Sequence, residues 1–129
     1  MGVSAYRTAK INTLPRELWP AAAYAGVLSL IGRAERAIAR GDPQDAHNAL
    51  VMAQHVVLAL KACLQPEAGE LSVHLASLYD YIAGQLGQAN VAKDAVRLQS
   101  LVQVIAPLRD AWENAGRQLL QGLPATGER

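Results

Sequence analysis

The sequence predicts an all-α fold: an antiparallel up-down four-helix bundle with an N-terminal arm and a disordered C-terminal tail. Hydrophobic residues make up 51% of the chain, but only 5% of residues are aromatic and none is phenylalanine, so the core must consist of Ala, Leu, Val and Ile. Apolar residues recur at steps of three and four along four segments, and no segment alternates with the period of two typical of strands. Because the connections between these segments are short, neighbouring helices should be antiparallel.

The domain organisation follows from length and composition. A chain of 129 residues suggests one domain with enough length for a substantial core. We expect residues 1–14 to form the N-terminal arm, residues 15–121 the four-helix bundle, and residues 122–129 a flexible tail. Pro124 and Gly127 are typical of such a tail because both residue types interrupt regular structure.

The first helix is expected from Pro15 or Pro20 to Arg40. Pro15 suits a helix N-terminus, whereas Pro20 must either begin the regular helix or kink it, because a helix interior does not tolerate its ring. Gly41 follows in the position that helix C-termini favour. The apolar stripe consists of Tyr24, Leu28, Ile31, Ala34 and Ile38.

The second helix has the clearest start in the sequence. Asp42 is a good N-cap, Pro43 is a good first helical residue, and Asp45 places a negative charge near the positive end of the helix dipole. The sequence Gln65-Pro66 should end the helix. The apolar stripe consists of Ala46, Leu50, Ala53, Val57, Leu60 and Leu64.

The third helix is expected from Glu70 to Ala89 and contains two glycines, Gly84 and Gly87. Each glycine costs about 1 kcal/mol relative to alanine in a helix interior. That cost indicates a close helix approach, or a groove where the backbone of a partner comes near. Asn90 is expected to end this helix and to cap the next one. The apolar stripe consists of Leu71, Leu75, Leu78, Ile82 and Leu86, with Tyr79 alongside.

The fourth helix is expected from Val91 or Ala92 to about Leu120. Pro107 lies inside it and should bend it, because proline removes a backbone hydrogen bond and its ring clashes with the preceding turn. The apolar face consists of Leu98, Leu101, Val102, Ile105, Leu108 and Trp112.

Composition also bounds the partners and the compartment. The net charge is +1 and no basic block occurs, which makes nucleic acid and anionic membranes poor candidates. Residues 1–14 lack the apolar run of a secretory signal, and the apolar-leaning stretch from Pro20 to Ile31 is too short to span a bilayer. The single cysteine, Cys63, excludes an internal disulfide and fits a reducing compartment. We therefore expect a soluble, cytosolic protein without membrane insertion.

The sequence contains no recognisable catalytic or metal-binding pattern. His47, His55 and His74 lack the spacing of helical metal sites, which place ligands three or four residues apart. None of them is followed by the lysine and glycine of histidine phosphotransfer modules, so that function is disfavoured. Cys63 has no base positioned by the sequence and is interpreted as a small packing residue. We expect no cofactor, no metal and no enzymatic activity.

The aromatic residues divide between core and surface. Tyr79 and Tyr81 lie about 200° apart around a helix, so only one of them can pack inside, with its hydroxyl group hydrogen-bonded. The other should be accessible, and the spacing alone leaves open which is which. Trp19 and Trp112 are expected to fill the core at the ends of the bundle.

Several short motifs occur in a characteristic order. The most specific pair is Leu78-Tyr79-Asp80-Tyr81 followed by Ala89-Asn90. The others are Ala5-Tyr6, Tyr24-Ala25-Gly26, Arg33 to Ile38, Gly41-Asp42, Ala53-Gln54 and Leu108 to Trp112. In these motifs the chain resembles the FliS family of flagellar export chaperones, which are small, cytosolic, four-helix proteins that bind flagellin before its secretion. It departs from the family at Ala25, where aspartate is expected, and at Pro20, Pro107, Gly84 and Gly87.

The resemblance implies a function and a partner. It implies a cytosolic chaperone that binds the disordered C-terminal segment of flagellin and prevents premature polymerisation before type III flagellar secretion. Other flagellar export components are further implied partners, and the isolated protein is expected to be a monomer or a dimer. The alternative is a helical adaptor or regulator that binds another flagellar or signalling protein.

The partner-binding residues are expected on the arm and on the third helix. The resemblance implies that the N-terminal arm lies over the client surface when no client is bound, with Tyr6 as its anchor. The expected contact residues are Tyr6, Tyr79, Tyr81, Gly84 and Gly87.

Overall fold

The computed structural model describes residues 18–122, and these residues form helices and turns without any strand. The elements in chain order are α2 (Trp19–Ala39), α3 (Pro43–Ala62), the short 3₁₀ helix η2 (Pro66–Ala68), α4 (Glu70–Ala92) and α5 (Ala95–Gly122). The predicted all-α bundle is therefore confirmed. The predicted arm, with Tyr6, and the part of the tail beyond Gly122 lie outside the described residues, so the division into arm, bundle and tail stays a prediction.

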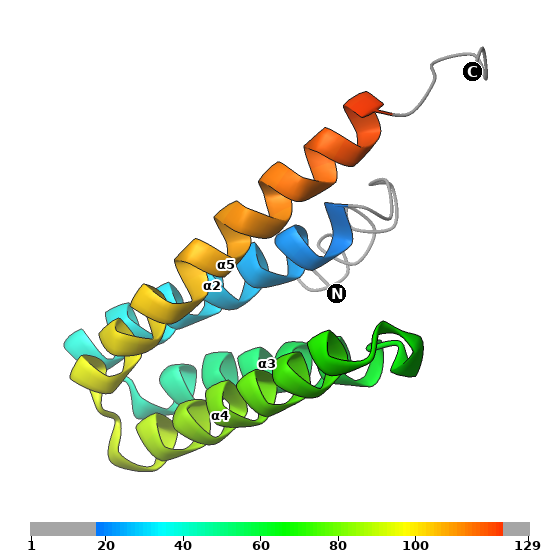
Figure 1. Ribbon diagram of the computed structural model, residues 1–129. Helices are drawn as coiled ribbons and strands as arrows, with labels where there is room; N and C mark the ends of the chain where they lie inside the picture. Colours follow the sequence, from blue (N-terminus) through cyan, green and yellow to red (C-terminus); the bar gives the residue numbers. More distant parts are fainter. Residues whose placement is uncertain (1–17, 123–129) are drawn as a thin grey trace.

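The four helices run up and down in two pairs (Figure 1). Helix α2 packs extensively against both α3 and α5, and α3 packs against α4, whereas α4 and α5 contact each other much less. The α2–α3 and α4–α5 turns lie at one end of the bundle, and the α3–α4 turn lies at the other. We call these the two-turn end and the single-turn end.

The starts of α2 and α3 agree with simple capping rules. Pro20 occupies the first turn of α2, so it begins this helix and does not kink it. Asp42 caps α3, because its Oδ1 accepts a hydrogen bond from the Asp45 backbone N–H at 3.0 Å. Gly41 has a φ of +74°, which is the left-handed conformation expected after a helix. The predicted boundary between the first two helices is confirmed.

The boundary between α4 and α5 differs from the prediction. Helix α4 continues to Ala92, and Asn90 is a buried residue inside it, so the expected cap at Asn90 is wrong. The cap of α5 is Asp94, whose Oδ1 accepts from the Arg97 backbone N–H at 3.1 Å. Asn90 remains helical because its side chain finds its partners in His47 and Lys93 and does not need the end of a helix.

Helix α5 continues through Pro107 as a single element of 28 residues. Pro107 is exposed, so its ring faces solvent and not a neighbouring helix. Proline has no backbone N–H, so the helical hydrogen bond that is missing at Pro107 is missing on the solvent-facing side of α5.

The core is built mainly from small and aliphatic residues, as composition predicted. Alanines are buried on α2, α3 and α4, and their short side chains allow the helix backbones to approach closely. Tyr24 and Tyr79 are the aromatic residues of the described core, and Asn90 is its one buried polar residue. The largest fully buried side chains are Tyr24, Ile31, Leu50, Ile82, Leu86, Leu98, Leu101, Ile105 and Val27.

Two expected packing residues lie on the surface. Cys63 is exposed because it follows the last residue of α3, where the chain turns away from the bundle. Trp19 is 38% exposed at the start of α2, so it does not fill the core as expected. Trp112 is half-buried and does pack against the core, in agreement with the prediction.

Candidate functional site

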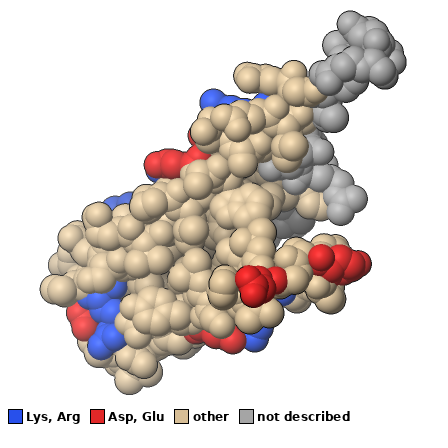
Figure 2. Space-filling view, viewed as in Figure 1, with Lys and Arg blue, Asp and Glu red and all other residues tan. Residues whose placement is uncertain are grey.

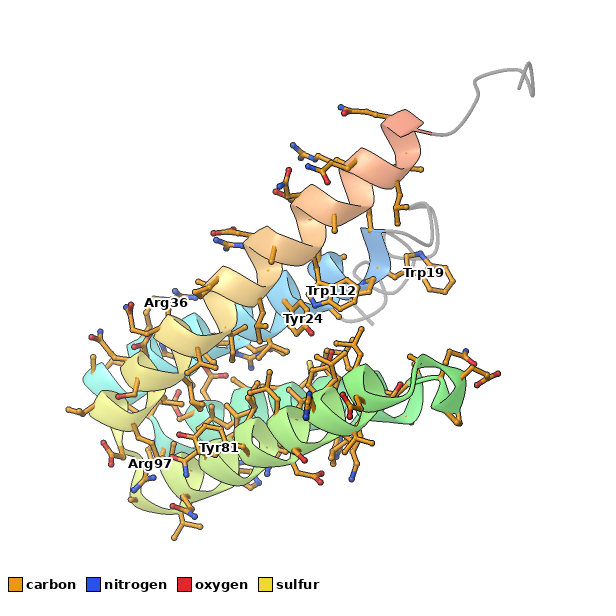
Figure 3. The ribbon with its side chains drawn as sticks, in the orientation of Figure 1. Trp19, Tyr24, Arg36, Tyr81, Arg97 and Trp112 are labelled. Atoms are coloured by element: carbon orange, nitrogen blue, oxygen red, sulfur yellow. The ribbon has the colours of Figure 1, made fainter. Side chains whose placement is uncertain are left out.

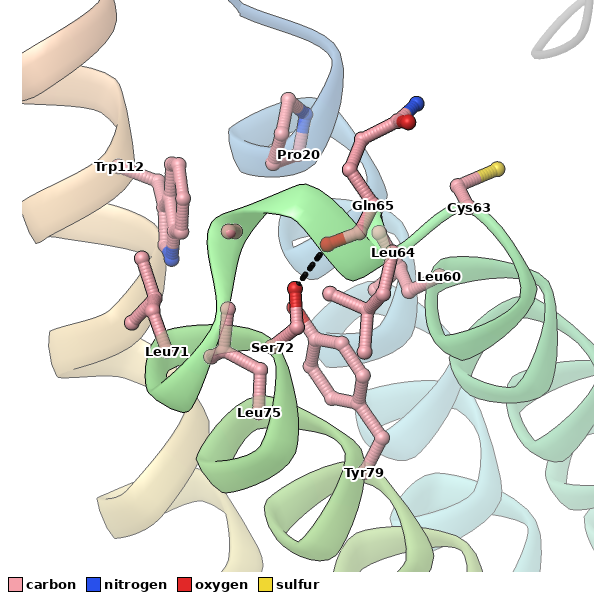
Figure 4. Close-up of a pocket in the computed structure, with 11 residues that line it drawn as sticks. Pro20, Leu60, Cys63, Leu64, Gln65, Leu71, Ser72, Leu75, Tyr79 and Trp112 are labelled. Carbon is pink, nitrogen blue, oxygen red and sulfur yellow. Dashed lines mark hydrogen bonds between the residues drawn. The ribbon is translucent and has the colours of Figure 1, made fainter.

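An apolar cleft of about 230 Å³ opens at the single-turn end of the bundle (Figure 4). All four long helices and the α3–α4 turn contribute to it, and none of the residues that line it carries a charged side chain. Figure 2 shows that uncharged residues make up most of the described surface on this side of the molecule. The lining residues are Pro20, Leu60, Cys63, Leu64, Gln65, Ala68, Leu71, Ser72, Leu75, Tyr79 and Trp112.

The α3–α4 turn forms one side of the cleft. Pro66 begins η2, and Gly69, with a φ of +64°, turns the chain into α4. The Ser72 hydroxyl group in the first turn of α4 donates a hydrogen bond back to the Gln65 carbonyl, drawn as a dashed line in Figure 4. This bond fixes the start of α4, which carries Leu71 and Leu75.

The opposite side comes from the other pair of helices. Pro20 at the start of α2 and Trp112 on α5 face the apolar side chains of α4 across the cleft (Figure 4). Leu71 is 55% exposed, which is unusual for a large apolar side chain. The cleft therefore offers an accessible apolar surface with an aromatic wall.

Tyr79 lies at the cleft and in the core at the same time. It is only 3% exposed, and its hydroxyl group hydrogen-bonds to that of Tyr24 on α2. The two rings have their centroids 6.3 Å apart at an interplanar angle of 47°. Burial, followed by the hydrogen bond to Tyr79, raises the pKa of Tyr24 above its ordinary value of 10.0, and a hydrogen bond from Trp112 acts in the opposite direction. Burial also raises the pKa of Tyr79.

Tyr81 is the accessible member of the tyrosine pair. It is 54% exposed and points away from the core (Figure 3). The structure thus settles which tyrosine packs inside. A signal for this choice was present in the sequence, because Tyr79 follows Leu75 by four residues and precedes Ile82 by three, and so continues the apolar stripe.

The two glycines of α4 have different surroundings. Gly84 is exposed, and a Cβ added there would meet nothing within 4 Å. A Cβ on Gly87 would lie 3.0 Å from Nε2 of Gln54, which donates a hydrogen bond to the Ala83 carbonyl at 3.0 Å. Gly87 therefore makes room for a side chain of α3. Its surroundings fit the expected close approach of two helices, and not a groove for the backbone of a partner.

The expected contact residues that the structure describes do not all lie at the cleft. Tyr79 lines the cleft, whereas Tyr81, Gly84 and Gly87 are not among its lining residues. Sequence reasoning assigned Trp112, Leu71 and Leu75 to the core and did not identify them as cleft residues. The unusual exposure of Leu71 depends on how the α3–α4 turn is placed, which no local pattern shows.

Two searches for other kinds of site cover the described residues. Residues 18–122 contain no group of three or more His, Cys, Asp or Glu side chains that could hold a metal ion. None of the helices in this range is long and apolar enough to cross a membrane. The uncharged, mostly apolar lining of the cleft can bind apolar side chains by excluding water from them.

The bundle and its apolar cleft define the class of the protein as a small all-α bundle. Within that class the chain belongs to the FliS family, because the family model described as "Flagellar protein FliS" matches residues 2–119. The resemblance found in the short motifs is thereby confirmed.

Three relatives support this membership, and each is named "Flagellar secretion chaperone FliS". The protein of Bacillus subtilis (strain 168) is 33% identical over 113 residues, which cover 87% of this chain and 84% of the relative. That of Salmonella typhimurium (strain LT2) is 32% identical over 90 residues, covering 68% and 67%. That of Vibrio cholerae serotype O1 is 27% identical over 90 residues, covering 69% and 66%. The chain is thus a member of a family of flagellar secretion chaperones.

Proposed function

We propose that this chain is a cytosolic export chaperone that binds the disordered C-terminal segment of flagellin and prevents premature polymerisation before type III flagellar secretion. The apolar cleft at the single-turn end is the observation that carries the proposal. A segment that becomes helical in a filament presents apolar side chains, and these need a covered, uncharged surface while the segment is a monomer.

The geometry of the cleft fits such a client. Its volume of about 230 Å³ accommodates one or two large apolar side chains and not a whole helix. The cleft would therefore anchor one point of a longer contact. The exposed face of α4 that carries Tyr81 and Gly84 is a proposed second contact, where the absence of a side chain on Gly84 permits close backbone approach.

A binding experiment tests the proposed client. Purified chain is titrated with monomeric flagellin from the same organism, and separately with flagellin that lacks its C-terminal segment. We expect saturable binding to the intact protein and loss of binding to the truncated one, together with slower filament assembly in the presence of the chaperone. Equal binding to both flagellins, or no binding to either, would contradict the proposal and favour an adaptor for another flagellar protein.

A pair of variants tests the site. Leu71→Asp places a charge at the mouth of the cleft, at a position already 55% exposed, so the fold should tolerate it. We expect flagellin affinity to fall at least about tenfold, because an unpaired charge would be desolvated at the contact. Val91→Asp is the matched control, since Val91 is 90% exposed on the same helix but at the two-turn end. If both variants bind as the wild type does, the cleft is not the contact.

A further inference from the structure

Three side chains are joined in series at the two-turn end, away from the cleft. Asn90 on α4 lies between His47 on α3 and Lys93 in the α4–α5 turn. The Asn90 Nδ2 lies 2.9 Å from the His47 Nδ1, and the Asn90 Oδ1 lies 2.8 Å from the Lys93 Nζ. Lys93 Nζ also donates to the backbone carbonyl of Asn90 at 2.5 Å. Asn90 thus ties α3, α4 and the turn together.

The chemistry of these groups fixes where the protons lie. A lysine ammonium group only donates, so the atom of the Asn90 amide that faces Lys93 must be its oxygen. The amide nitrogen then faces His47 and donates, which requires the His47 Nδ1 to accept. This pattern of bonds therefore exists only with a neutral imidazole that carries its proton on Nε2.

We propose that this series is a pH-sensitive tie between α3 and the α4–α5 turn, intact while His47 is neutral and broken when His47 is protonated. A protonated imidazole has two donors and no acceptor, so it cannot receive the amide N–H of Asn90. If the amide rotates to offer its oxygen to the imidazolium, the NH₂ group then faces the Lys93 ammonium. The amide can serve one cation or the other, but not both.

The charged groups around the series do not replace the lost bond. Lys93 and Asp42 line a shared hollow with Ile38, Gly41 and Pro43. Asp42 caps α3 and lies 3.5 Å from Arg40, whereas Asp45 pairs with Arg33 and Arg40. Asp94 caps α5 and lies 3.7 Å from Arg97. Among residues 18–122, no hydrogen bond or ion pair joins His47 or Lys93 to a carboxylate.

The turn that this tie holds is an unusual one. Lys93 has a φ of +51°, and it is the one non-glycine residue with positive φ in the described part of the chain. Residues other than glycine rarely adopt this backbone conformation without support from neighbouring groups. Because α4 and α5 contact each other little, the turn and the Arg97–Gln85 hydrogen bond at 2.6 Å are the described polar links between them. Breaking the tie should therefore loosen the α4–α5 connection first.

Two measurements on the full chain test the proposal. In the first, two-bond ¹H–¹⁵N correlation spectra recorded along a pH titration give the protonation state of His47. Where the imidazole is neutral they should show the Nε2–H tautomer, and an Nδ1–H tautomer or a rapidly exchanging mixture would overturn the proposal. In the second, hydrogen exchange is followed at the Asp94 amide, which donates to the Ala89 carbonyl at 3.0 Å. After correction for intrinsic rates, its protection should fall roughly three- to tenfold between a pH at which the spectra show His47 neutral and one at which they show it protonated, the effect of losing one hydrogen bond.

Variants separate the tie from general acid effects. His47→Asn supplies an oxygen near the position of Nδ1 that accepts but is not protonated, so protection at Asp94 should become independent of pH. His47→Ala should give low protection at both pH values. His55→Asn, at another exposed histidine of α3, is the matched control and should behave as the wild type does. If His47→Asn loses protection in acid as strongly as the wild type, the tie is not the cause; the tautomer measurement needs no variant and stands by itself.

Discussion

The hydroxyl groups of Tyr24 and Tyr79 hydrogen-bond to each other inside the bundle, joining α2 to α4 across its centre. Both side chains are buried, and Tyr79 also forms part of the apolar cleft. This contact links the only two aromatic rings of the described core and lies directly behind the proposed binding surface. A change at either tyrosine should therefore affect stability and the cleft together.

The two hydroxyl groups should not contribute independently to the free energy of unfolding. Removing one of them should lose more than half of the stability that is lost when both are removed. Tyr79→Phe leaves the Tyr24 hydroxyl group with Trp112 alone, and Tyr24→Phe leaves the buried Tyr79 hydroxyl group without its partner. We expect each single variant to lose about 1–2 kcal/mol of unfolding free energy. The double variant should lose less than the sum, with a coupling energy of about 1 kcal/mol. Urea denaturation of the four proteins measures this cycle, and additive losses would show that the hydroxyl groups do not interact.

The same pair predicts a loss of stability in alkali. The pKa of Tyr24 is raised in the folded protein, first by burial and then by the hydrogen bond to Tyr79. A group with a raised folded pKa contributes stability that is fully present below its unfolded pKa, about 10 for tyrosine, and lost as the pH rises beyond it. We expect the unfolding free energy to fall above about pH 10. Tyr24→Phe should flatten this fall, measured by thermal unfolding across the alkaline range; an unchanged slope would contradict the assignment.

Much of the fold could be predicted because it is specified locally. Asp42-Pro43 marks a helix start by itself, and stripes at steps of three and four mark the faces that must pack. Asn90 shows where a local rule was misapplied. It follows Leu86 by four residues and so continues the buried stripe of α4, but asparagine is also a common cap. Tertiary partners, His47 and Lys93, decided between the two.

The candidate site could not be predicted in the same way. Pro20, Leu64, Leu71 and Trp112 are far apart in sequence and meet only because the α3–α4 turn lies opposite the start of α2. Each of these residues also fits a packing role, so nothing local distinguishes a cleft residue from a core residue. The 200° between Tyr79 and Tyr81, by contrast, predicted that one of them is accessible, and the structure shows that it is Tyr81.

The two glycines of α4 should respond differently to alanine. A Cβ at Gly84 meets open space, so Gly84→Ala should stabilise the protein by up to about 1 kcal/mol through helix propensity. At Gly87 the new Cβ would press on the Gln54 amide at 3.0 Å and disturb its hydrogen bond to Ala83, so the gain should be smaller or reversed. Thermal unfolding of the matched pair measures the difference. An equal gain at both sites would show that Gln54 moves aside without cost.

Gly84→Ala also tests the proposed second contact. If a flagellin segment approaches the α4 backbone closely at Gly84, the variant should bind more weakly although it is more stable. Isothermal titration with monomeric flagellin measures the affinity. Unchanged affinity would remove this face of α4 from the contact while leaving the cleft proposal intact.

Asp45 should affect how the stability of the protein changes in strong acid. Its carboxylate accepts hydrogen bonds from Arg33 and from Arg40, and these bonds, Arg33 first, hold the pKa of Asp45 below its usual range. A group with a lowered folded pKa contributes stability that is present above its unfolded pKa, about 3.9 for aspartate, and lost as the pH falls through the folded value. Asp45→Asn should therefore reduce proton uptake on unfolding below about pH 4, by at most about one proton, and lower Tm at neutral pH.

Asp80→Asn, which removes the single exposed pair with Lys61 at 2.8 Å, is the comparison for loss of an ordinary ion pair. If the two variants lower Tm equally at neutral pH and share the wild-type slope in acid, the two arginines do not act on Asp45 in the way the geometry indicates.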